Sequence, residues 1–158
     1  MPKRKLTILM ADDDEEDRIF VREAFAGKPV DVRSVVNGTE LLDYLLCREQ
    51  YGDVTRHPRP DLILLDLNMP VMGGKEALAE IRAESCLKSI PIVILTTSQE
   101  ECECHKCYEL GANTYIVKPL SFDELVEIMH SLHLYWGDVA KLPIQPIPPS
   151  CEENSNRA

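Results

Sequence analysis

Five short apolar runs recur along the chain, and each has the length and side-chain pattern of a β-strand. They cover residues 6–11, 30–36, 61–66, 91–96 and 114–118. The run at 30–36 alternates between apolar and polar residues, which is typical of a partly exposed strand. The first and third runs are nearly continuous in apolar residues and end in acids, which indicates buried strands that carry carboxylates at their carboxyl ends.

Amphipathic stretches separate these runs and predict five helices. They cover roughly residues 15–26, 39–50, 75–84, 99–110 and 122–136. Asp14 is placed to cap the first helix, and Ser121 with Glu124 forms a capping-box pattern before the last. Residues 51–60 contain Gly, Asp, Thr, His and two prolines and predict a long loop.

Strands that alternate with helices predict an α/β fold, a five-stranded parallel sheet with helices on both faces. The length of 158 residues fits one domain, which we assign to residues 1–140. Residues 141–158 contain four prolines and no periodicity, so we expect a disordered Pro-rich tail there. The chain length leaves no room for a receptor, a catalytic domain and an output domain together.

Composition argues against a DNA-binding protein and against a membrane protein. The net charge of −10 opposes binding to a phosphate backbone, so no DNA partner is expected. The apolar runs are too short to cross a bilayer, and the amino terminus turns acidic where a signal peptide stays apolar, so we expect no membrane contact and a cytoplasmic location. Six cysteines could form three disulfides, but in such a chain reduced thiols are the favoured interpretation.

Polar residues stand where the predicted strands end. Asp12 and Asp13 follow the first strand, Asp66 ends the third, Thr96 the fourth and Lys118 the fifth. The carboxyl ends of parallel strands share one edge of the sheet, where ligands bind in such folds. Clustered carboxylates need a cation, and a site with oxygen ligands alone suits Mg²⁺. The ammonium and hydroxyl groups could then bind the oxygens of a phosphoryl group that one carboxylate accepts.

Each of these residues has a structural explanation when it is taken singly. Asp12 or Asp14 is as well explained as a cap of the following helix. A Thr that ends a strand, or a Lys before a Pro, is usually structural or solvated. The joint pattern favours a functional site, because five polar residues reach one edge while the strand interiors stay apolar.

The pattern resembles the receiver domains of two-component response regulators, of the chemotaxis-regulator type. The resemblance covers about residues 5–136 and rests on four motifs: Asp12-Asp13 after ILMA, the stretch from Asp66 to Gly74 (DLNMPVMGG), Thr96-Thr97 after VIL, and Gly111-Ala112 followed by YIVKP at 115–119. It implies the flavodoxin-like (βα)5 receiver fold. It also implies a binding protein with self-catalysed phosphotransfer and dephosphorylation, and not an enzyme that turns over a substrate.

The resemblance assigns roles to the residues at the sheet edge. It makes Asp66 the phospho-acceptor, which takes its phosphoryl group from a histidine of a sensor kinase. Asp12, Asp13 and Asp66 would hold Mg²⁺ together with the backbone carbonyl of Asn68. No general base is needed, because an aspartate is already ionised at neutral pH.

The resemblance also implies a switch. Thr96 and Lys118 would contact the phosphoryl oxygens, and Tyr115 would turn into the space that Thr96 leaves. This pair would reshape the surface formed by the fourth helix, fifth strand and fifth helix. Tyr115 is alternatively an ordinary half-buried strand aromatic. The family pattern also implies a cis peptide bond between Lys118 and Pro119.

A finer resemblance is to stand-alone regulators that serve phytochrome-type sensor kinases. It rests on the loop at 51–60, the LTTS run at 95–98 and the Leu134-Tyr135-Trp136 ending before a Leu-Pro segment. Aromatic residues at the end of a helix favour interfaces, which indicates a possible homodimer.

Other functions stay open at this point. One is a Mg²⁺-dependent phosphohydrolase that forms an aspartyl phosphate, although such enzymes carry an acid where this chain has Asn68 and need a cap domain. Another is a receiver-shaped scaffold that takes no phosphate. Cys102, Cys104, His105 and Cys107 resemble a soft-metal or redox cluster, but one helical turn is a poor frame for a tetrahedral zinc site, so incidental thiols are favoured.

Overall fold

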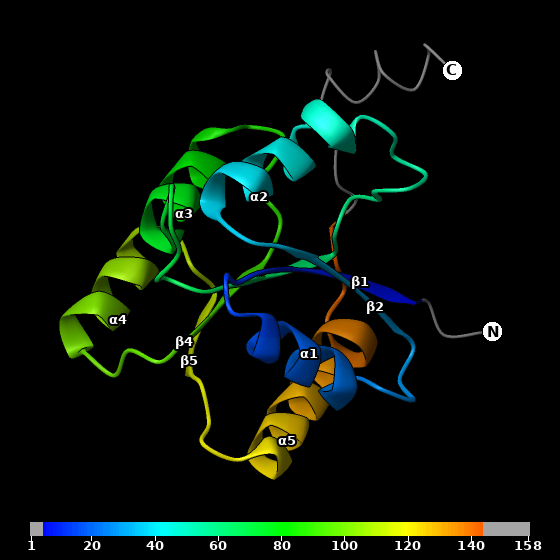
Figure 1. The fold of residues 1–158 in the computed structure, drawn as a ribbon, viewed down its shortest axis with the longest axis vertical. Helices are drawn as coiled ribbons and strands as arrows, with labels where there is room; N and C mark the ends of the chain where they lie inside the picture. Colours follow the sequence, from blue (N-terminus) through cyan, green and yellow to red (C-terminus); the bar gives the residue numbers. More distant parts are fainter. Residues whose placement is uncertain (1–4, 144–158) are drawn as a thin grey trace.

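The sheet has five parallel strands in the order β2-β1-β3-β4-β5 (Figure 1). The computed structural model describes residues 5–143. The strands are β1 Leu6–Ala11, β2 Val30–Val35, β3 Leu62–Leu65, β4 Ile92–Thr96 and β5 Thr114–Val117. This order is the flavodoxin-like one, in which the crossover direction reverses between β1 and β3. The predicted fold class is therefore confirmed.

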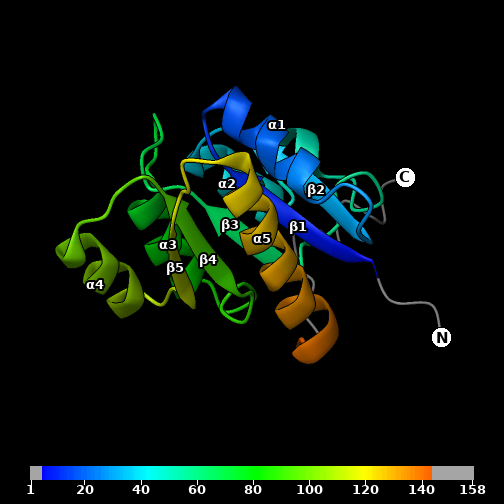
Figure 2. The same ribbon diagram turned by 90° about the horizontal axis from the view of Figure 1, so that it is seen from below.

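Helices cover both faces of the sheet. They are α1 Glu15–Ala24, α2 Gly38–Leu45, α3 Gly74–Ala83, α4 Glu101–Glu109 and α5 Phe122–His133, with a 3-10 turn at Glu49–Tyr51 and a π-helical segment at Leu134–Val139. Figures 1 and 2 show α1 and α5 side by side on one face, and α2, α3 and α4 on the other.

The strand side chains divide the core between the two faces. Ile8 and Met10 pack with α1 and α5, while Leu9 and Ala11 pack with α2 and α3. The three central strands are buried on both sides because successive side chains point to opposite faces. Each large side chain removed from water in this way contributes about 1.5–3 kcal/mol. The polar residues at the strand ends are thereby held at a rigid edge.

Local capping sets where the helices begin. The Asp14 side chain accepts hydrogen bonds from the backbone N–H groups of Glu16 and Asp17, and the Ser121 side chain accepts one from Glu124. Both caps agree with the sequence prediction. Acidic side chains in the first turn of α1 further stabilise the helix, because they lie at the positive end of its dipole.

The end of α2 differs from the prediction. The helix was expected to run to residue 50 but ends at Leu45, because Cys47 takes a left-handed conformation with φ of 56°. The turn lets Tyr51 fold back onto Tyr44, with ring centroids 5.0 Å apart, and onto His57 at 4.9 Å. Burial of the Tyr51 ring stabilises the protein more than a further turn of helix would. Hydrophobic periodicity could not predict this, because the contact is made in the tertiary structure.

Two further expectations are wrong. Cys47 forms a disulfide bond, whereas the four other cysteines within residues 5–143, Cys86, Cys102, Cys104 and Cys107, are free thiols. Disulfide formation depends on the separation of two particular residues in space, which composition does not report. No cis peptide bond occurs in the described residues, so the bond between Lys118 and Pro119 is trans, the commoner isomer for any X–Pro bond.

The boundary at residue 140 stays a prediction, because most of the expected tail lies outside the described residues. Within 5–143, no helix combines the length and apolar character needed to cross a bilayer.

Candidate functional site

Three carboxylates meet at the carboxyl edge of the sheet. Asp12 and Asp13 follow β1, and Asp66 follows β3, its neighbour in the sheet. One oxygen from each of them lies within 4.8 Å of the others. Asp12 and Asp66 are buried, and Asp13 is exposed. Among residues 5–143, this is the group of acidic, His or Cys side chains that lies close enough together to hold a metal ion.

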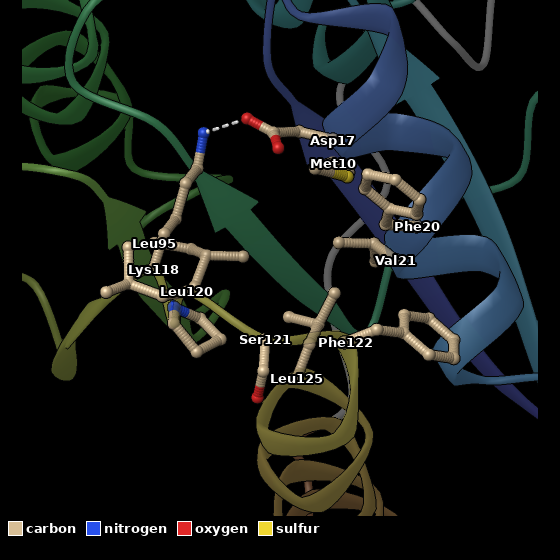
Figure 3. A pocket seen from close by; sticks show the side chains of 11 residues that line it. Met10, Asp17, Phe20, Val21, Leu95, Lys118, Leu120, Ser121, Phe122 and Leu125 are labelled. Carbon is tan, nitrogen blue, oxygen red and sulfur yellow. Dashed lines mark hydrogen bonds and ion pairs between the residues drawn. The ribbon is translucent and has the colours of Figure 1, made fainter.

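Lys118 reaches this cluster from the end of β5. Its backbone N–H donates to the Thr96 carbonyl at 2.7 Å, which continues the ladder between β4 and β5. Its aliphatic stem runs along a pocket of about 280 Å³ between α1 and α5, which apolar side chains largely line (Figure 3). The side chain is 12% exposed, so the ammonium group is nearly withdrawn from water.

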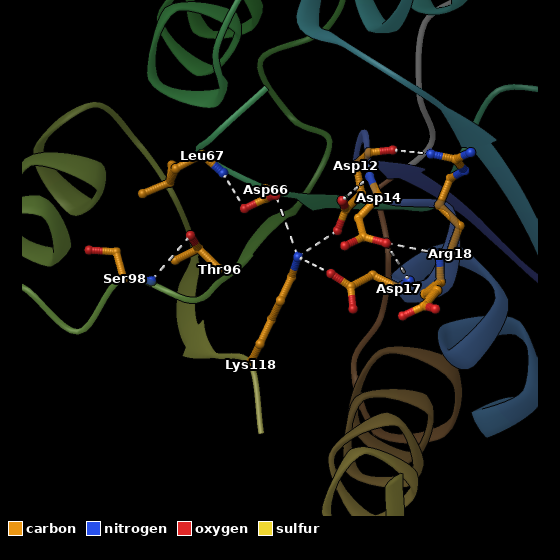
Figure 4. Close-up of polar contacts among 10 residues, drawn as sticks. Asp12, Asp14, Asp17, Arg18, Asp66, Leu67, Thr96, Ser98 and Lys118 are labelled. Atoms are coloured by element: carbon orange, nitrogen blue, oxygen red, sulfur yellow. Dashed lines mark hydrogen bonds and ion pairs between the residues drawn. The ribbon is translucent and has the colours of Figure 1, made fainter. Parts of the chain in front are cut away.

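The ammonium group lies among three carboxylates (Figure 4). Lys118 Nζ is 2.7 Å from Asp12 Oδ2, 2.8 Å from Asp17 Oδ2 and 3.4 Å from Asp66 Oδ2. The two shorter distances are those of charge-assisted hydrogen bonds, and the third is at the long limit. The strongest partners of Lys118 in this state are therefore Asp12 and Asp17.

The buried charges perturb one another in opposite directions. Burial raises the pKa of Asp12, and its hydrogen bond from Lys118 offsets this in part. For Lys118, burial disfavours the charged form, but hydrogen bonds to Asp12 and Asp17 outweigh it and raise the pKa above the ordinary value. Lys118 therefore stays cationic at neutral pH and neutralises the acidic cluster.

The backbone around Asp66 is packed tightly against the start of α3. Asp66 Oδ1 accepts a hydrogen bond from the Leu67 N–H at 2.8 Å, which orients the carboxylate. Gly74 lies so close that a Cβ there would sit 2.2 Å from the Asp66 carbonyl oxygen. The glycine in the DLNMPVMGG motif is thus required by this close approach.

Ser98 joins Thr96 to Tyr115 through two hydrogen bonds. Ser98 donates its backbone N–H to Thr96 Oγ1 at 3.5 Å, a long contact, and accepts the Tyr115 hydroxyl on its carbonyl at 2.9 Å. Thr96 is fully buried, and Tyr115 packs partly against the core. Ser98 therefore contacts both Thr96 and Tyr115.

The structure thus brings Asp12, Asp13, Asp66, Thr96 and Lys118 to one edge, as the strand pattern indicated. Asn68 is exposed two residues after Asp66, and its expected metal contact through the backbone stays a prediction.

Asp17 and Ser98 were missed. Neither residue was selected as part of the site from the sequence pattern. The place of Asp17 in the first turn of α1, a helix that starts at the acidic edge, is the signal that could have identified that residue.

The fourth-helix cluster is not assembled as a metal site. His105 is largely exposed and pairs with Glu109 at 3.1 Å, and Cys102 is exposed. Cys107 is buried in the core, where desolvation raises the pKa of its thiol. Cys102 and His105 therefore face solvent while Cys107 lies in the core, so the three side chains do not converge on one ion.

The donor set of the acidic cluster fits a hard divalent cation. Carboxylate oxygens are the ligands that such ions prefer. Closely spaced, partly buried carboxylates are costly without a positive charge, and Lys118 supplies one in the structure.

Comparison with known proteins gives matches over most of the chain. The response regulator receiver domain family matches residues 8–130. Response regulator Rcp1 of Synechocystis is 35% identical over 138 residues, which cover 86% of this chain and 92% of Rcp1. The chain is also similar to the crystal structure of the phosphorylated cyanobacterial phytochrome response regulator RcpA, at a TM-score of 0.81 and 37% identity over 88% of this chain and 99% of RcpA.

A Mn²⁺-bound form of Rcp1 has a TM-score of 0.77 and 34% identity, with coverage of 90% of this chain and 100% of the other. The match favours a signalling receiver over the phosphohydrolase alternative. Sequence motifs, sheet order and the family match agree, and the chain belongs to the response regulator receiver domain family.

Proposed function

We propose that Asp66 is the phospho-acceptor of this regulator and takes its phosphoryl group from a histidine of a sensor kinase. The observation that carries the proposal is the position of Asp66 among Asp12, Asp13 and Lys118, where one carboxylate has a cationic group beside it and further acids next to it. Phosphoryl transfer needs in-line positioning and charge neutralisation and little covalent help from the protein.

The metal would be Mg²⁺, held by the carboxylates of Asp12, Asp13 and Asp66 and the backbone carbonyl of Asn68. When bound, it would neutralise charge on the phosphoryl oxygens. The Mn²⁺-bound form of Rcp1 supports divalent binding in a relative. The protein's own part is to hold Lys118 and the Thr96 hydroxyl beside the acceptor, so that they contact the phosphoryl oxygens that the cation leaves free. The same groups would support slow self-catalysed dephosphorylation.

The switch would run from Thr96 to Tyr115. A phosphoryl group on Asp66 attracts the Thr96 hydroxyl, which weakens its long contact with Ser98. The Tyr115 hydroxyl is bonded to the same Ser98, so the ring is free to turn inward when that loop moves. The exposed surface of α4, β5 and α5 would then change shape for a protein partner or a phosphorelay.

The kinase would be of the phytochrome type, since the relative RcpA is a phytochrome response regulator. The proposal also puts both partners in the cytoplasm and gives the regulator no role in DNA binding. A second copy of the chain would bind at the end of α5, where Leu134, Tyr135 and Val139 are exposed.

Incubation with acetyl phosphate and Mg²⁺ tests the acceptor. We expect one phosphoryl group per chain by intact-mass spectrometry, and none on an Asp66→Asn variant, because the amide is not a nucleophile. Asp61→Asn, which changes an acid at the opposite end of the same strand, is the matched control and should be labelled like the parent.

Equal labelling of the Asp66→Asn variant would show that another residue accepts the group. Absence of labelling in the parent would favour a scaffold, and continuous phosphate release from many phosphate esters would favour a hydrolase.

A further inference from the structure

Asp17 is a charged residue at the site to which the proposed phosphotransfer gives no role. It lies in the first turn of α1 and outside the group formed by Asp12, Asp13 and Asp66. Its Oδ2 nevertheless lies 2.8 Å from Lys118 Nζ, while Asp66 Oδ2 is 3.4 Å away. Lys118 thus lies closer to Asp17 than to Asp66, the residue on which the phosphoryl group would form.

The three carboxylates that contact Lys118 differ in whether they could also bind a divalent cation. Asp12 and Asp66 belong to the acidic cluster that suits a divalent cation, whereas Asp17 does not. When a cation binds, Asp12 has a second positive partner. Among the described residues, Asp17 is then the carboxylate of these three whose side chain contacts Lys118 alone, on the α1 side of the site (Figure 4).

The surroundings of Lys118 leave it room to change position. The pocket of about 280 Å³ runs along its stem, between Phe20 and Val21 of α1 and Leu125 of α5 (Figure 3). A lysine stem has several rotatable bonds and can adopt another rotamer in such a space without disturbing the core. The apolar lining offers the ammonium group few polar partners, so its position is decided by the carboxylates.

We propose that Asp17 is a positioning residue that holds Lys118 in the unphosphorylated state and releases it to the phosphoryl group on Asp66. The proposal rests on the assignment of Asp66 as phospho-acceptor. A phosphoryl group brings a dianion close to Lys118, and the ammonium group moves from Asp17 towards it. Asp17 therefore competes with the phosphoryl group for one cation and sets how readily the phosphorylated state forms.

The competition has a definite sign. The pair between Asp17 and Lys118 stabilises the unphosphorylated state and is lost when Lys118 moves. Removing the pair therefore favours the phosphorylated state. Asp17 is about one-third exposed, so the effect is smaller than that of a buried ion pair. We expect roughly a threefold to tenfold change in affinity for a phosphoryl analogue, as for a partly exposed, charge-assisted hydrogen bond.

The test is a calorimetric titration with beryllium fluoride at fixed Mg²⁺, which imitates the phosphoryl group on an aspartate. Asp17→Asn should bind the analogue threefold to tenfold more tightly than the parent. Glu16→Gln is the matched control, because it removes one negative charge from the residue just before Asp17. Glu16 is exposed and does not contact Lys118. It should change the affinity less than twofold. Unchanged circular dichroism and thermal unfolding would establish that both variants fold.

A double-mutant cycle separates positioning from a general charge effect. In a Lys118→Ala background, Asp17→Asn should no longer increase the affinity, because the residue that it releases is missing. An increase that persists in this background, or one no larger than that of Glu16→Gln, overturns the proposal. Both of these outcomes occur in a protein that is labelled at Asp66. A parent that neither binds the analogue nor is labelled would overturn the proposed function itself.

Discussion

Helices α3 and α4 follow β3 and β4, the strands that place Asp66 and Thr96 at the edge of the sheet, yet the two helices are attached to the core very differently. Helix α3 buries Gly74, Ala77, Leu78 and Ile81. Cys107 is the one buried residue of α4, all nine residues of which the structure describes. The acceptor side of the site is therefore anchored by packing, and the side of the proposed switch is not.

Polar contacts take the place of packing at α4. Glu103 pairs with Lys75 of α3 at 3.1 Å, and the Ser98 side chain also acts on Glu103 and lowers its pKa. Ser98 in turn accepts the Tyr115 hydroxyl. Exposed ion pairs are weak, so we expect α4 and the loop before it to open more readily than α3. A rigid acceptor beside a weakly held helix is what a phosphorylation switch requires, because movement on one side must not disturb the chemistry on the other.

The largest effect should come from removing the packing of α3. Ile81→Ala should lower the free energy of unfolding by about 2–5 kcal/mol, because it leaves a cavity in a fully buried site. Cys107→Ala in α4 should cost about 1 kcal/mol, since one small apolar group is lost. Urea denaturation measures both. Equal losses would contradict the difference in anchoring.

A smaller effect should follow from disturbing the contact between α3 and the acceptor loop. Gly74→Ala should cost about 1–3 kcal/mol and slow labelling of Asp66, because the new methyl group would overlap the Asp66 carbonyl oxygen. Gly73→Ala is the milder control, since a Cβ there would lie 3.2 Å from the Leu67 carbonyl oxygen, a tight contact that a small shift relieves, and its φ of −78° suits alanine. If both variants were labelled at the parent's rate, packing at Gly74 would not position the acceptor.

The smallest effect should come from the polar link of α4. Hydrogen bonding to Ser98 and the pair with Lys75 lower the pKa of Glu103 below its ordinary value of 4.5. A lowered pKa means that the stabilisation is complete above pH 4.5 and is lost as the pH falls through the folded-state pKa. The parent should exceed Glu103→Gln in stability by roughly 0.2–1 kcal/mol at pH 7.

That difference should disappear in acid when unfolding curves are measured from pH 7 to pH 3. A difference that is constant with pH would mean that the charge on Glu103 does not hold α4. Hydrogen exchange of the α4 amides should become faster in the same variant at pH 7, while that of the α3 amides should stay unchanged.

Much of the fold could be read from hydrophobic periodicity. The limits of β1 were predicted to the residue, and those of the other strands to within one residue. The caps at Asp14 and Ser121 were predicted because capping is a local interaction between neighbours in sequence. The α2 terminus was missed because Tyr51 packs on Tyr44 and His57, which is a contact across a loop.

The candidate site divides in the same way. That Asp12, Asp66, Thr96 and Lys118 would meet followed from their places at strand ends, since parallel strands bring their carboxyl ends to one edge. The pairing of Lys118 with Asp17 and the link through Ser98 did not follow, because they depend on side-chain directions from α1 and on the path of the loop after β4.

The amino-acid sequence alone determined the order of strands and helices, the family and the set of residues at the acidic edge, because each depends on local pattern or on motif. The tertiary structure decided which carboxylates bind Lys118, how tightly α3 and α4 are held, and that Cys47 forms a disulfide. The physical reason is distance. Hydrogen bonds, packing and disulfides act over a few ångströms in space, and Lys118 lies 106 and 101 residues along the chain from its partners Asp12 and Asp17.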